Sequence, residues 1–401
     1  MAYEFTREDV EFLRSPRGAE ELALVDQMPL TEQTLVRDIT SARERHGDRA
    51  AALIETIRLR RRARIKLAAD RPWLLTADAL EQATPLLVAR HRAQRLHGRD
   101  IHDVTCSIGA DLAVLAEHGR SVIGSDIDPV RASMAAHNAP AALVIRADAL
   151  VPSSRGTVVV ADPARRADGR RTHDPSKLVP PLPDLLTAYA DRDLVVKCAP
   201  GIDYDALGWP GEVEVVSLDG GVRETALWSR GLTDGGTTRR ATILRSDGAR
   251  DMLTDAEPDD IPERPEGQWI IDPDGAIVRS GLVRHYAARE GLWQLDPRIA
   301  YLTGDHRPAG ARGHRILERA PFREKPLRAL LRRLDCGSLE ILARGVRIDP
   351  DALRRRLKPS GTRSLSLVIV RIGDSSEAFV CEPVAPTTAT ASPGAAPPSP
   401  S

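Results

Sequence analysis

The feature that most constrains the fold is a series of short apolar segments that alternate with helical patterns. The apolar segments are residues 101–105, 121–125, 142–145, 157–161 and 194–197. Helical spacing of apolar residues occurs between several of them, near 112–117, 130–138 and 182–190. Short buried strands that alternate with helices are typical of βαβ units, which form a parallel sheet. We therefore predict a doubly wound, Rossmann-like α/β domain, with its ligand crevice at the carboxyl ends of the strands.

Two further apolar segments follow these strands. Residues 212–218 and 224–229 flank Asp219, Gly220 and Gly221, a pattern typical of an antiparallel hairpin with a tight glycine turn. A parallel sheet that finishes in an antiparallel hairpin resembles the strand order of class I methyltransferases more than that of a dehydrogenase.

Residues 1–96 are expected to form an N-terminal helical region. Thr6 and Asp9 have the spacing of a capping box, which marks the start of a helix. Thr76 has the position of a later N-cap, and Pro85 is expected to break or restart the helix that follows Thr76. Apolar residues recur at helical spacing in 19–25, 49–65 and 86–96.

The sheet domain is placed at residues 97–235, and the pattern changes after it. Residues 236–383 are predicted to form a separate α+β region, which begins after a glycine-rich boundary. Near its end Asp349 is expected to cap a helix that has Pro350 at its first position, among elements at 326–334, 339–343, 365–371 and 377–382. Residues 384–401, rich in Pro, Ala, Ser and Thr, are predicted to be a disordered tail.

Composition narrows the class of protein. No segment approaches the ~20 continuous apolar residues of a membrane-spanning helix, and the N-terminus lacks the apolar core of a secretory signal, so we expect a cytosolic protein without a membrane segment. The formal net charge is zero, which confines any nucleic-acid contact to local basic clusters. The 4 cysteines lie far apart and the histidines lack metal-ligand spacing, so we expect neither disulfides nor a metal site.

The first predicted strand leads into a loop, residues 103–111 with the sequence DVTCSIGAD, that opens a helix. Backbone N–H groups at such a helix start can face a ligand, and the missing Cβ of Gly109 would let the backbone approach that ligand closely. A dinucleotide-binding loop would carry GxGxxG, but Gly109 is the one glycine here. Asp103 would repel a pyrophosphate, whereas it suits the cationic amino group of a methionine moiety. Taken alone, the loop is equally compatible with an ordinary strand-turn-helix connection.

Acidic residues also follow the second and third strands. Asp126 ends the segment SVIGSD about 20 residues after the first loop, where a carboxylate can accept both hydroxyls of a ribose. Asp128 precedes Pro129, and we interpret it as a helix N-cap. Asp148 could accept a hydrogen bond from the exocyclic amine of an adenine, or it could simply form a turn.

The fourth strand ends in the segment VVVADPARR, with Asp162 and Pro163 at the carboxyl end of the strand. Asp162 is therefore expected to open into the same crevice. A carboxylate and a backbone carbonyl that accept the two N–H bonds of an exocyclic amine can pull it toward sp³ geometry and align it for attack. The alternative, an Asp-Pro turn that closes a strand, does not explain why an acidic residue follows each of the four strands.

Together, DVTCSIGAD, VIGSDIDP, IRAD and ADPARR resemble class I S-adenosylmethionine-dependent methyltransferases. Within them the chain is most similar to the branch that contains the trimethylguanosine cap enzymes and a bacterial group with a C-terminal THUMP-like domain. The resemblance covers about residues 77–230, and also 339–383 with its segment ARGVRIDPDALRRRL.

The resemblance implies S-adenosylmethionine as the cofactor and RNA as the partner, with a ribosomal or transfer RNA favoured. It implies cofactor contacts by Asp103, Gly109, Asp126 and Asp148. The segment LEQAT, which ends at Thr84, is similar to a region of that branch that closes over the cofactor, and it adds Thr84 to the cofactor-binding residues.

The resemblance also implies that Asp162 and Pro163 position the target. Enzymes that methylate exocyclic amines usually carry two prolines and then an aromatic residue after the acid or amide, whereas Pro163 is followed by Ala164 and Arg165. We interpret Arg165 and Arg166 as substrate-binding residues, because a guanidinium can stack on a base or bind a phosphate. Alternatively, the target is not an exocyclic amine, or activity has been lost.

Three basic clusters are compatible with an RNA partner. The cluster beside Asp162 is the best placed for phosphate contacts, whereas a solvated helix face explains the others equally well; the clusters are 58–64, 165–171 and 354–358. The first hypothesis is thus an RNA methyltransferase that acts on a base nitrogen, with guanine favoured. The alternative hypothesis is a noncatalytic RNA-binding protein with the same fold, and a nicotinamide-dependent dehydrogenase is disfavoured by the missing glycines and the hairpin. The oligomeric state is not predicted.

Overall fold

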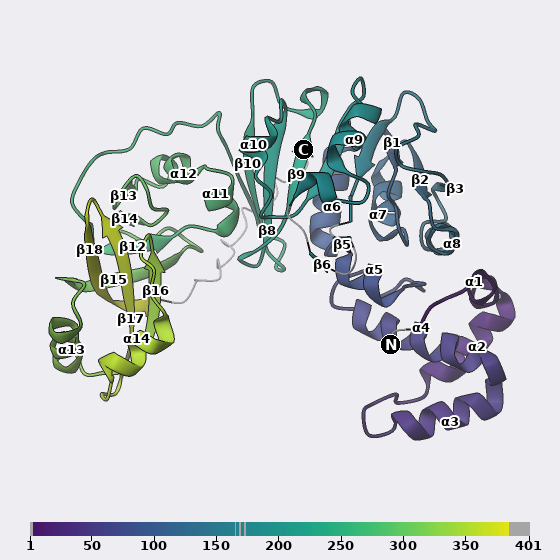
Figure 1. Cartoon of the computed structure of the whole chain (residues 1–401), viewed down its shortest axis with the longest axis horizontal. Coiled ribbons are helices and arrows are strands. Elements are labelled where there is room, and N and C mark those ends of the chain that lie inside the picture. Colours follow the sequence, from purple (N-terminus) through teal and green to yellow (C-terminus); the bar gives the residue numbers. More distant parts are fainter. Residues whose placement is uncertain (1–2, 165, 168–169, 172–173, 385–401) are drawn as a thin grey trace, which may run out of the picture. The chain divides into compact units, whose positions relative to one another are not determined.

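The computed structural model describes residues 3–164, 166–167, 170–171 and 174–384 (Figure 1). These residues form two compact units, which we treat separately. Unit 1 consists of Met1–Thr238 with Leu244–Arg250, and unit 2 of Arg239–Ile243 with the residues from Asp251 onward. The predicted segment boundaries after residues 96, 235 and 383 stay predictions, and the predicted tail 384–401 lies outside the described residues apart from Val384.

The N-terminal part of unit 1 is helical, as predicted. Thr6 starts the first helix with the expected capping box, because its backbone N–H donates to Asp9 Oδ2 at 2.9 Å and its Oγ1 accepts from the Asp9 N–H at 3.1 Å. A helix that the sequence patterns did not single out, α3, lies between the second and fourth. The helices are α1 (Arg7–Arg14), α2 (Pro16–Asp26), α3 (Leu35–His46) and α4 (Ala50–Ala63), with a 3₁₀ turn η1 (Gly47–Arg49).

Two short helices precede the sheet, and each begins at a residue that the sequence marked as a helix start or interruption. Helix α5 (Ala77–Gln82) begins at Thr76, whose Oγ1 accepts from the Ala79 N–H at 3.2 Å. Helix α6 (Leu86–Arg95) begins directly after Pro85, which confirms the predicted interruption. The link between the helices therefore holds Thr84 next to the first turn of α6.

The sheet of unit 1 has the predicted class I methyltransferase arrangement (Figure 1). Its order is β3-β2-β1-β4-β7-β9-β8, and the neighbouring strands β3, β2, β1, β4 and β7 are parallel to one another. Strand β9 is antiparallel to both β7 and β8, as the hairpin pattern predicted. The strands are β1 (Asp100–Asp103), β2 (Ser121–Asp126), β3 (Leu143–Arg146), β4 (Val158–Ala161), β7 (Leu194–Cys198), β8 (Glu212–Leu218) and β9 (Gly221–Trp228). Two further strands, β10 (Arg239–Leu244) and β11 (Arg250–Thr254), have most of their residues in unit 2.

Helices cover this sheet and share its core with the N-terminal region. Buried side chains such as Leu53 of α4, Ile101 of β1 and Leu112 belong to one apolar cluster, so the N-terminal helices and the sheet fold around the same core. The helices between and after the strands are α7 (Ala110–His118), α8 (Pro129–Asn138), α9 (Leu182–Ala188) and α10 (Tyr204–Leu207), with 3₁₀ turns η2 (Pro175–Lys177) and η3 (Arg230–Leu232).

Unit 2 is a seven-stranded sheet with helices, which confirms the predicted α+β class. Its order is β13-β14-β12-β15-β18-β17-β16, antiparallel except for β16 and β17. Asp349 caps α14 as predicted, since its Oδ1 accepts from the Asp351 and Ala352 N–H groups. The elements are β12 (Trp269–Asp272), α11 (Gly275–Arg279), α12 (Val283–Arg289), β13 (Trp293–Gln294), β14 (Leu302–Gly304), β15 (Arg312–Pro321), α13 (Glu324–Arg333), β16 (Cys336–Arg344), α14 (Pro350–Leu357), β17 (Arg363–Ile372) and β18 (Ser375–Val384).

Candidate functional site

A cavity of about 410 Å³ lies at the carboxyl ends of the parallel strands. The four strand-end carboxylates that the sequence singled out, Asp103, Asp126, Asp148 and Asp162, all line it, and Thr84 lines it too. Four residues spread over 60 positions of the chain therefore meet at one edge of the sheet. This is the crevice in which doubly wound proteins bind their ligands.

The loop after β1 forms the floor of this cavity. Asp103 Oδ1 accepts from the Thr105 N–H at 3.1 Å, and the Ser107 N–H donates to Asp126 Oδ2 at 3.0 Å, which ties the first loop to the end of β2. Asp103 is only 4% exposed. Burial, together with the nearby carboxylate of Asp111, raises the pKa of Asp103 to about 7.

The structure explains the glycine at position 109 differently from the sequence analysis. Its φ of 78° places it in the left-handed region just before α7. A Cβ at this position would lie 2.9 Å from the Cα of Ala135 in α8, and Gly109 is not among the residues that line the cavity. The missing Cβ therefore lets two helices pack closely, whereas the sequence suggested a close approach to the ligand.

Asp126 and Asp128 have different roles at the end of β2. Asp126 Oδ1 accepts from the Asp128 N–H at 2.9 Å, and burial raises the pKa of Asp126. Asp128 is the N-cap of α8, as predicted, with its Oδ1 accepting from Val130 at 2.7 Å and from Arg131 at 3.0 Å. Only Asp126 of the two lines the cavity.

Asp148 forms the turn that was one of its two predicted roles, and the contact with an adenine stays a prediction. Its Oδ1 accepts from the Leu150 N–H at 2.9 Å, which is a turn contact, and its side chain still lines the cavity after β3. One oxygen forming the turn does not prevent the carboxylate from meeting a ligand, because an ionised carboxylate has about four acceptor positions.

Asp162 lies at the end of β4 with its backbone held in place. Its N–H donates to Thr105 Oγ1 at 2.6 Å, which links it to the loop after β1. Its side chain is 43% exposed, so it is open to the cavity. Pro163 is buried, and the wall next to Asp162 is formed by Ala164, which pairs with Val179 in an isolated bridge.

The two arginines that the sequence assigned to the substrate are only partly described. Arg165 lies outside the described residues. Arg166 begins strand β5 (Arg166–Ala167), which pairs antiparallel with β6 (Arg170–Arg171) just after the Asp162 segment, and its side chain also lies outside the description.

Lys197 is a site residue that the sequence reasoning missed. It stands in β7, and its Nζ donates to Asp162 Oδ2 at 2.5 Å and to Thr84 Oγ1 at 2.7 Å. The signal that could have found it is a lysine inside the apolar segment LVVKC, because a lysine is rarely buried without a charged partner.

A second group of buried charges supports the wall of the cavity from α6. Arg92 donates to Asp111 Oδ2 at 2.7 Å and to Glu224 of β9 at 2.8 Å. Burial alone would raise the pKa of Asp111, but the positive charges of Arg92 and Lys197 outweigh it and lower that pKa to about 2. Arg95 similarly pairs with Glu212 at 2.7 Å and Glu214 at 2.6 Å in β8.

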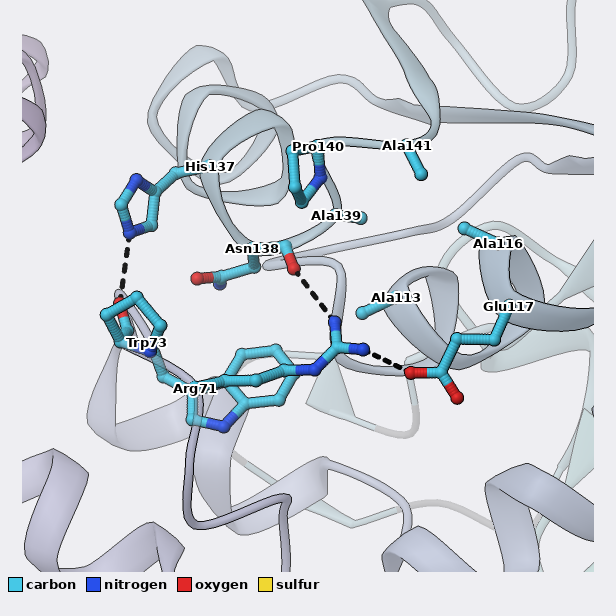
Figure 2. A pocket seen from close by; sticks show the side chains of 11 residues that line it. Arg71, Trp73, Ala113, Ala116, Glu117, His137, Asn138, Ala139, Pro140 and Ala141 are labelled. Carbon is cyan, nitrogen blue, oxygen red and sulfur yellow. Dashed lines mark hydrogen bonds and ion pairs between the residues drawn. The ribbon is translucent and has the colours of Figure 1, made fainter.

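A second cavity, of about 350 Å³, lies between the segment before α5 and the helices α7 and α8. Figure 2 shows its Arg71 guanidinium between the Glu117 carboxylate and the backbone carbonyl of Asn138. His137 hydrogen-bonds the Pro72 carbonyl at 3.0 Å. These polar groups thus contact one another and link the segment before α5 to α7 and α8. None of the strand-end carboxylates lines this second cavity.

The first cavity fits a ligand with a cationic group. Asp103 is a buried carboxylate with a raised pKa, which a cationic group would stabilise in its ionised form. Asp111 Oδ1, also in the wall, is buried without a hydrogen-bond partner among the described residues, so it is free to accept from a ligand. Among those residues, no three His, Cys, Asp or Glu side chains are grouped as metal ligands, and no helix is long and apolar enough to cross a membrane.

Comparisons with known proteins support S-adenosylmethionine as the cofactor. The chain is 55% identical over 358 residues, 85% of its length, to an uncharacterised S-adenosylmethionine-dependent methyltransferase of two Mycobacterium tuberculosis strains, and the match covers 99% of that protein. Residues 311–383 match a family described as THUMP domain-like, and 6–63 match a domain of unknown function.

A solved structure shows the same fold. It belongs to a Porphyromonas gingivalis W83 protein described as a methyltransferase; the match has a TM-score of 0.72 at 20% identity and covers 96% of this chain and 100% of that one. Because the Mycobacterium tuberculosis relatives are matched over nearly their whole length, the family is established. The chain belongs to the S-adenosylmethionine-dependent methyltransferases with a C-terminal THUMP-like domain.

Proposed function

We propose that this methyltransferase modifies a base nitrogen in RNA, with guanine favoured. The observation that carries the proposal is the position of Asp162, at the end of β4 in the same cavity as Asp103, Asp126 and Asp148. An exposed carboxylate at this position can accept an N–H bond from an exocyclic amine. Guanine is favoured by the resemblance to the trimethylguanosine cap enzymes.

The chain's own residues would divide cofactor and acceptor binding between them. Asp103 would hold the amino group of S-adenosylmethionine, Asp126 its ribose hydroxyls and Asp148 its adenine, with Thr84 in the wall and Gly109 shaping the loop. When bound, the cofactor supplies an electrophilic methyl group. Asp162 would orient the acceptor nitrogen, and the buried Pro163 would keep the backbone next to Asp162 rigid.

RNA as the partner is supported by the THUMP-like match over residues 311–383 and by basic residues near the site. Arg165 and Arg166 would bind the RNA next to the acceptor. In unit 2, two of the α14 arginines already have acidic neighbours, since Arg354 pairs with Asp351 and Arg356 with Glu324. We therefore assign the contacts with the acceptor RNA to Arg165 and Arg166. We further propose that the enzyme acts in the cytosol on ribosomal or transfer RNA.

A second candidate is a noncatalytic RNA-binding protein that keeps the fold and the cofactor. The observation that favours it is Ala164, which follows Pro163 where related amine methyltransferases carry another proline. Arg165 takes the next position, where those enzymes carry an aromatic ring that can stack on a base, so the alignment of an acceptor base depends on other residues.

The test is transfer of labelled methyl groups to total RNA from cells that lack this protein. Wild-type protein is expected to label the RNA, and Asp162→Ala is expected to lose the activity while it keeps its affinity for the cofactor. Asp184→Ala, which changes an exposed acid in the first turn of α9, is the matched control and should label RNA normally. Wild-type protein that binds RNA without labelling it would favour the noncatalytic candidate, and mass spectrometry of the labelled nucleosides identifies the base.

A further inference from the structure

Lys197 is a buried cation in a strand that is otherwise apolar. In β7 the residues Leu194, Val195 and Val196 are buried, and the Lys197 side chain is only 12% exposed. A buried ammonium is costly unless charged or polar partners replace its water. A lysine at this buried position therefore indicates a functional role for its ammonium group.

The ammonium has three N–H bonds, and three oxygens surround it. Asp162 Oδ2 lies 2.5 Å from Nζ, Thr84 Oγ1 lies 2.7 Å away and Asp111 Oδ2 lies 3.8 Å away. The Thr84 hydroxyl accepts from Lys197 and donates to Asp111 Oδ2 at 2.9 Å. Lys197 thus donates two hydrogen bonds to protein oxygens, and Asp111 Oδ2 lies at the longer distance of an ion pair.

The three oxygens come from three different walls of the cavity. Asp162 ends β4, Asp111 is in the first turn of α7, and Thr84 follows α5. Helix α5 and the residues after it supply Asp78, Ala79, Gln82 and Ala83 to the same cavity, as part of its wall. A single side chain thus connects the wall segment 78–84 to the carboxylate at the proposed acceptor position.

We propose that Lys197 is a positioning residue that fixes Asp162 for the acceptor and couples it to the wall segment 78–84. By engaging Oδ2, Lys197 restricts the Asp162 side chain to one orientation and leaves Oδ1 for the acceptor N–H. This inference rests on the proposed role of Asp162 as the acceptor-binding carboxylate.

A role for Lys197 as a general base does not fit its surroundings. Burial alone would lower the pKa of Lys197, but the carboxylates of Asp162 and Asp111 outweigh it and raise that pKa above its ordinary value. At neutral pH the ammonium is therefore protonated and has no lone pair to accept a proton. Its contribution is geometric and electrostatic.

The test compares Lys197→Met and Lys197→Arg with the control Lys177→Met, which removes a lysine that is 70% exposed from an exposed pair with Asp174. Lys197→Met is expected to lower kcat by about 100-fold, because a misplaced acceptor carboxylate no longer aligns the amine. Cofactor affinity should stay equal or increase, since a positive charge has left an acidic cavity. A merely structural role would instead weaken cofactor binding together with kcat.

Two further readouts separate this inference from the proposed function. In hydrogen exchange, S-adenosylhomocysteine should protect residues 77–84 of the wild type, and this protection should be lost in Lys197→Met even if no RNA is ever labelled. Thr84→Val should also lower kcat. The double variant of Lys197→Met and Thr84→Val should show a smaller fall in kcat than the product of the two single effects. Lys197→Arg, which keeps the charge with a different shape, should recover part of kcat.

The inference is overturned if wild-type protein labels RNA and Lys197→Met has a normal kcat, or if the protection of residues 77–84 persists in that variant. Absence of labelling by the wild type with loss of protection in Lys197→Met would instead refute the proposed function and support the coupling.

Discussion

The buried carboxylate of Asp103 predicts that cofactor affinity depends on pH near neutrality. Its pKa of about 7 in the free protein means that half of the molecules carry a protonated Asp103 at that pH. A cationic amino group binds to the ionised form, because the attraction needs the negative charge. Cofactor binding must therefore release the proton wherever Asp103 was protonated before.

The size of the effect follows from the position of that pKa. Below a pKa of about 7 the ionised fraction falls about tenfold for each pH unit, so the Kd for S-adenosylmethionine should rise about tenfold between about pH 8 and about pH 6. At about pH 6, nearly one proton should be released for each cofactor bound, and almost none at about pH 8.

Isothermal titration calorimetry measures both quantities. Titrations in two buffers with different ionisation enthalpies give the number of protons released, and a series of pH values gives Kd. Asp103→Asn is the matched variant, because it keeps the shape of the side chain and cannot ionise. It should bind the cofactor more weakly, with a Kd that is flat across this pH range.

Two outcomes would refute this reasoning. A wild-type Kd that does not change between these pH values would mean that Asp103 is ionised before the cofactor arrives, or that it does not contact the amino group. A slope that persists in Asp103→Asn and disappears in Asp126→Asn would assign the titration to Asp126, whose pKa burial also raises.

Three further predictions concern stability, and urea unfolding measures each. Asn138→Ala should cost about 2–4 kcal/mol, because the Asn138 amide satisfies the Leu74 N–H and carbonyl and the Ile108 carbonyl at 2.7–2.9 Å in a buried site; a loss below about 1 kcal/mol would contradict this. Arg92→Met should cost about 3–5 kcal/mol by leaving buried carboxylates unpaired, and an unchanged midpoint would show that they find other partners. Gly109→Ala should cost more than about 1 kcal/mol, since it meets α8 backbone and a φ of 78°, and a neutral result would mean that α8 shifts freely.

Local signals predicted the fold well. The alternation of strands and helices from residue 101 onward, the hairpin at Asp219 and the caps at Thr6, Thr76, Asp128 and Asp349 all match the structure. These signals succeed because each depends on the backbone of a few neighbouring residues. Parallel strands also end at the same edge of a sheet, so the sequence alone predicts that the four acidic strand ends line one cavity.

Signals that depend on distant partners could not be predicted in the same way. The partners of Arg92 and Arg95 in β9 and β8, Glu224 and Glu212, lie more than 100 positions away in the sequence. Lys197 had no visible partner in sequence, because Thr84 and Asp162 reach it only through the folded sheet. Gly109 was placed correctly in the loop but for a reason that only the neighbouring helix α8 reveals.

Asp103 and Asp111 show why residue type alone does not assign a role. They stand at the two ends of one loop and both line the cavity. Arg92 and Lys197 hold the pKa of Asp111 near 2, so through its Oδ2 it is an ionised anchor for α6 and β7. Asp103 has only a more distant positive charge and a pKa of about 7. A cation bound beside it would therefore stabilise its ionised form. The fold thus uses its own cations to stabilise Asp111, and we propose that the cofactor's amino group does the same for Asp103.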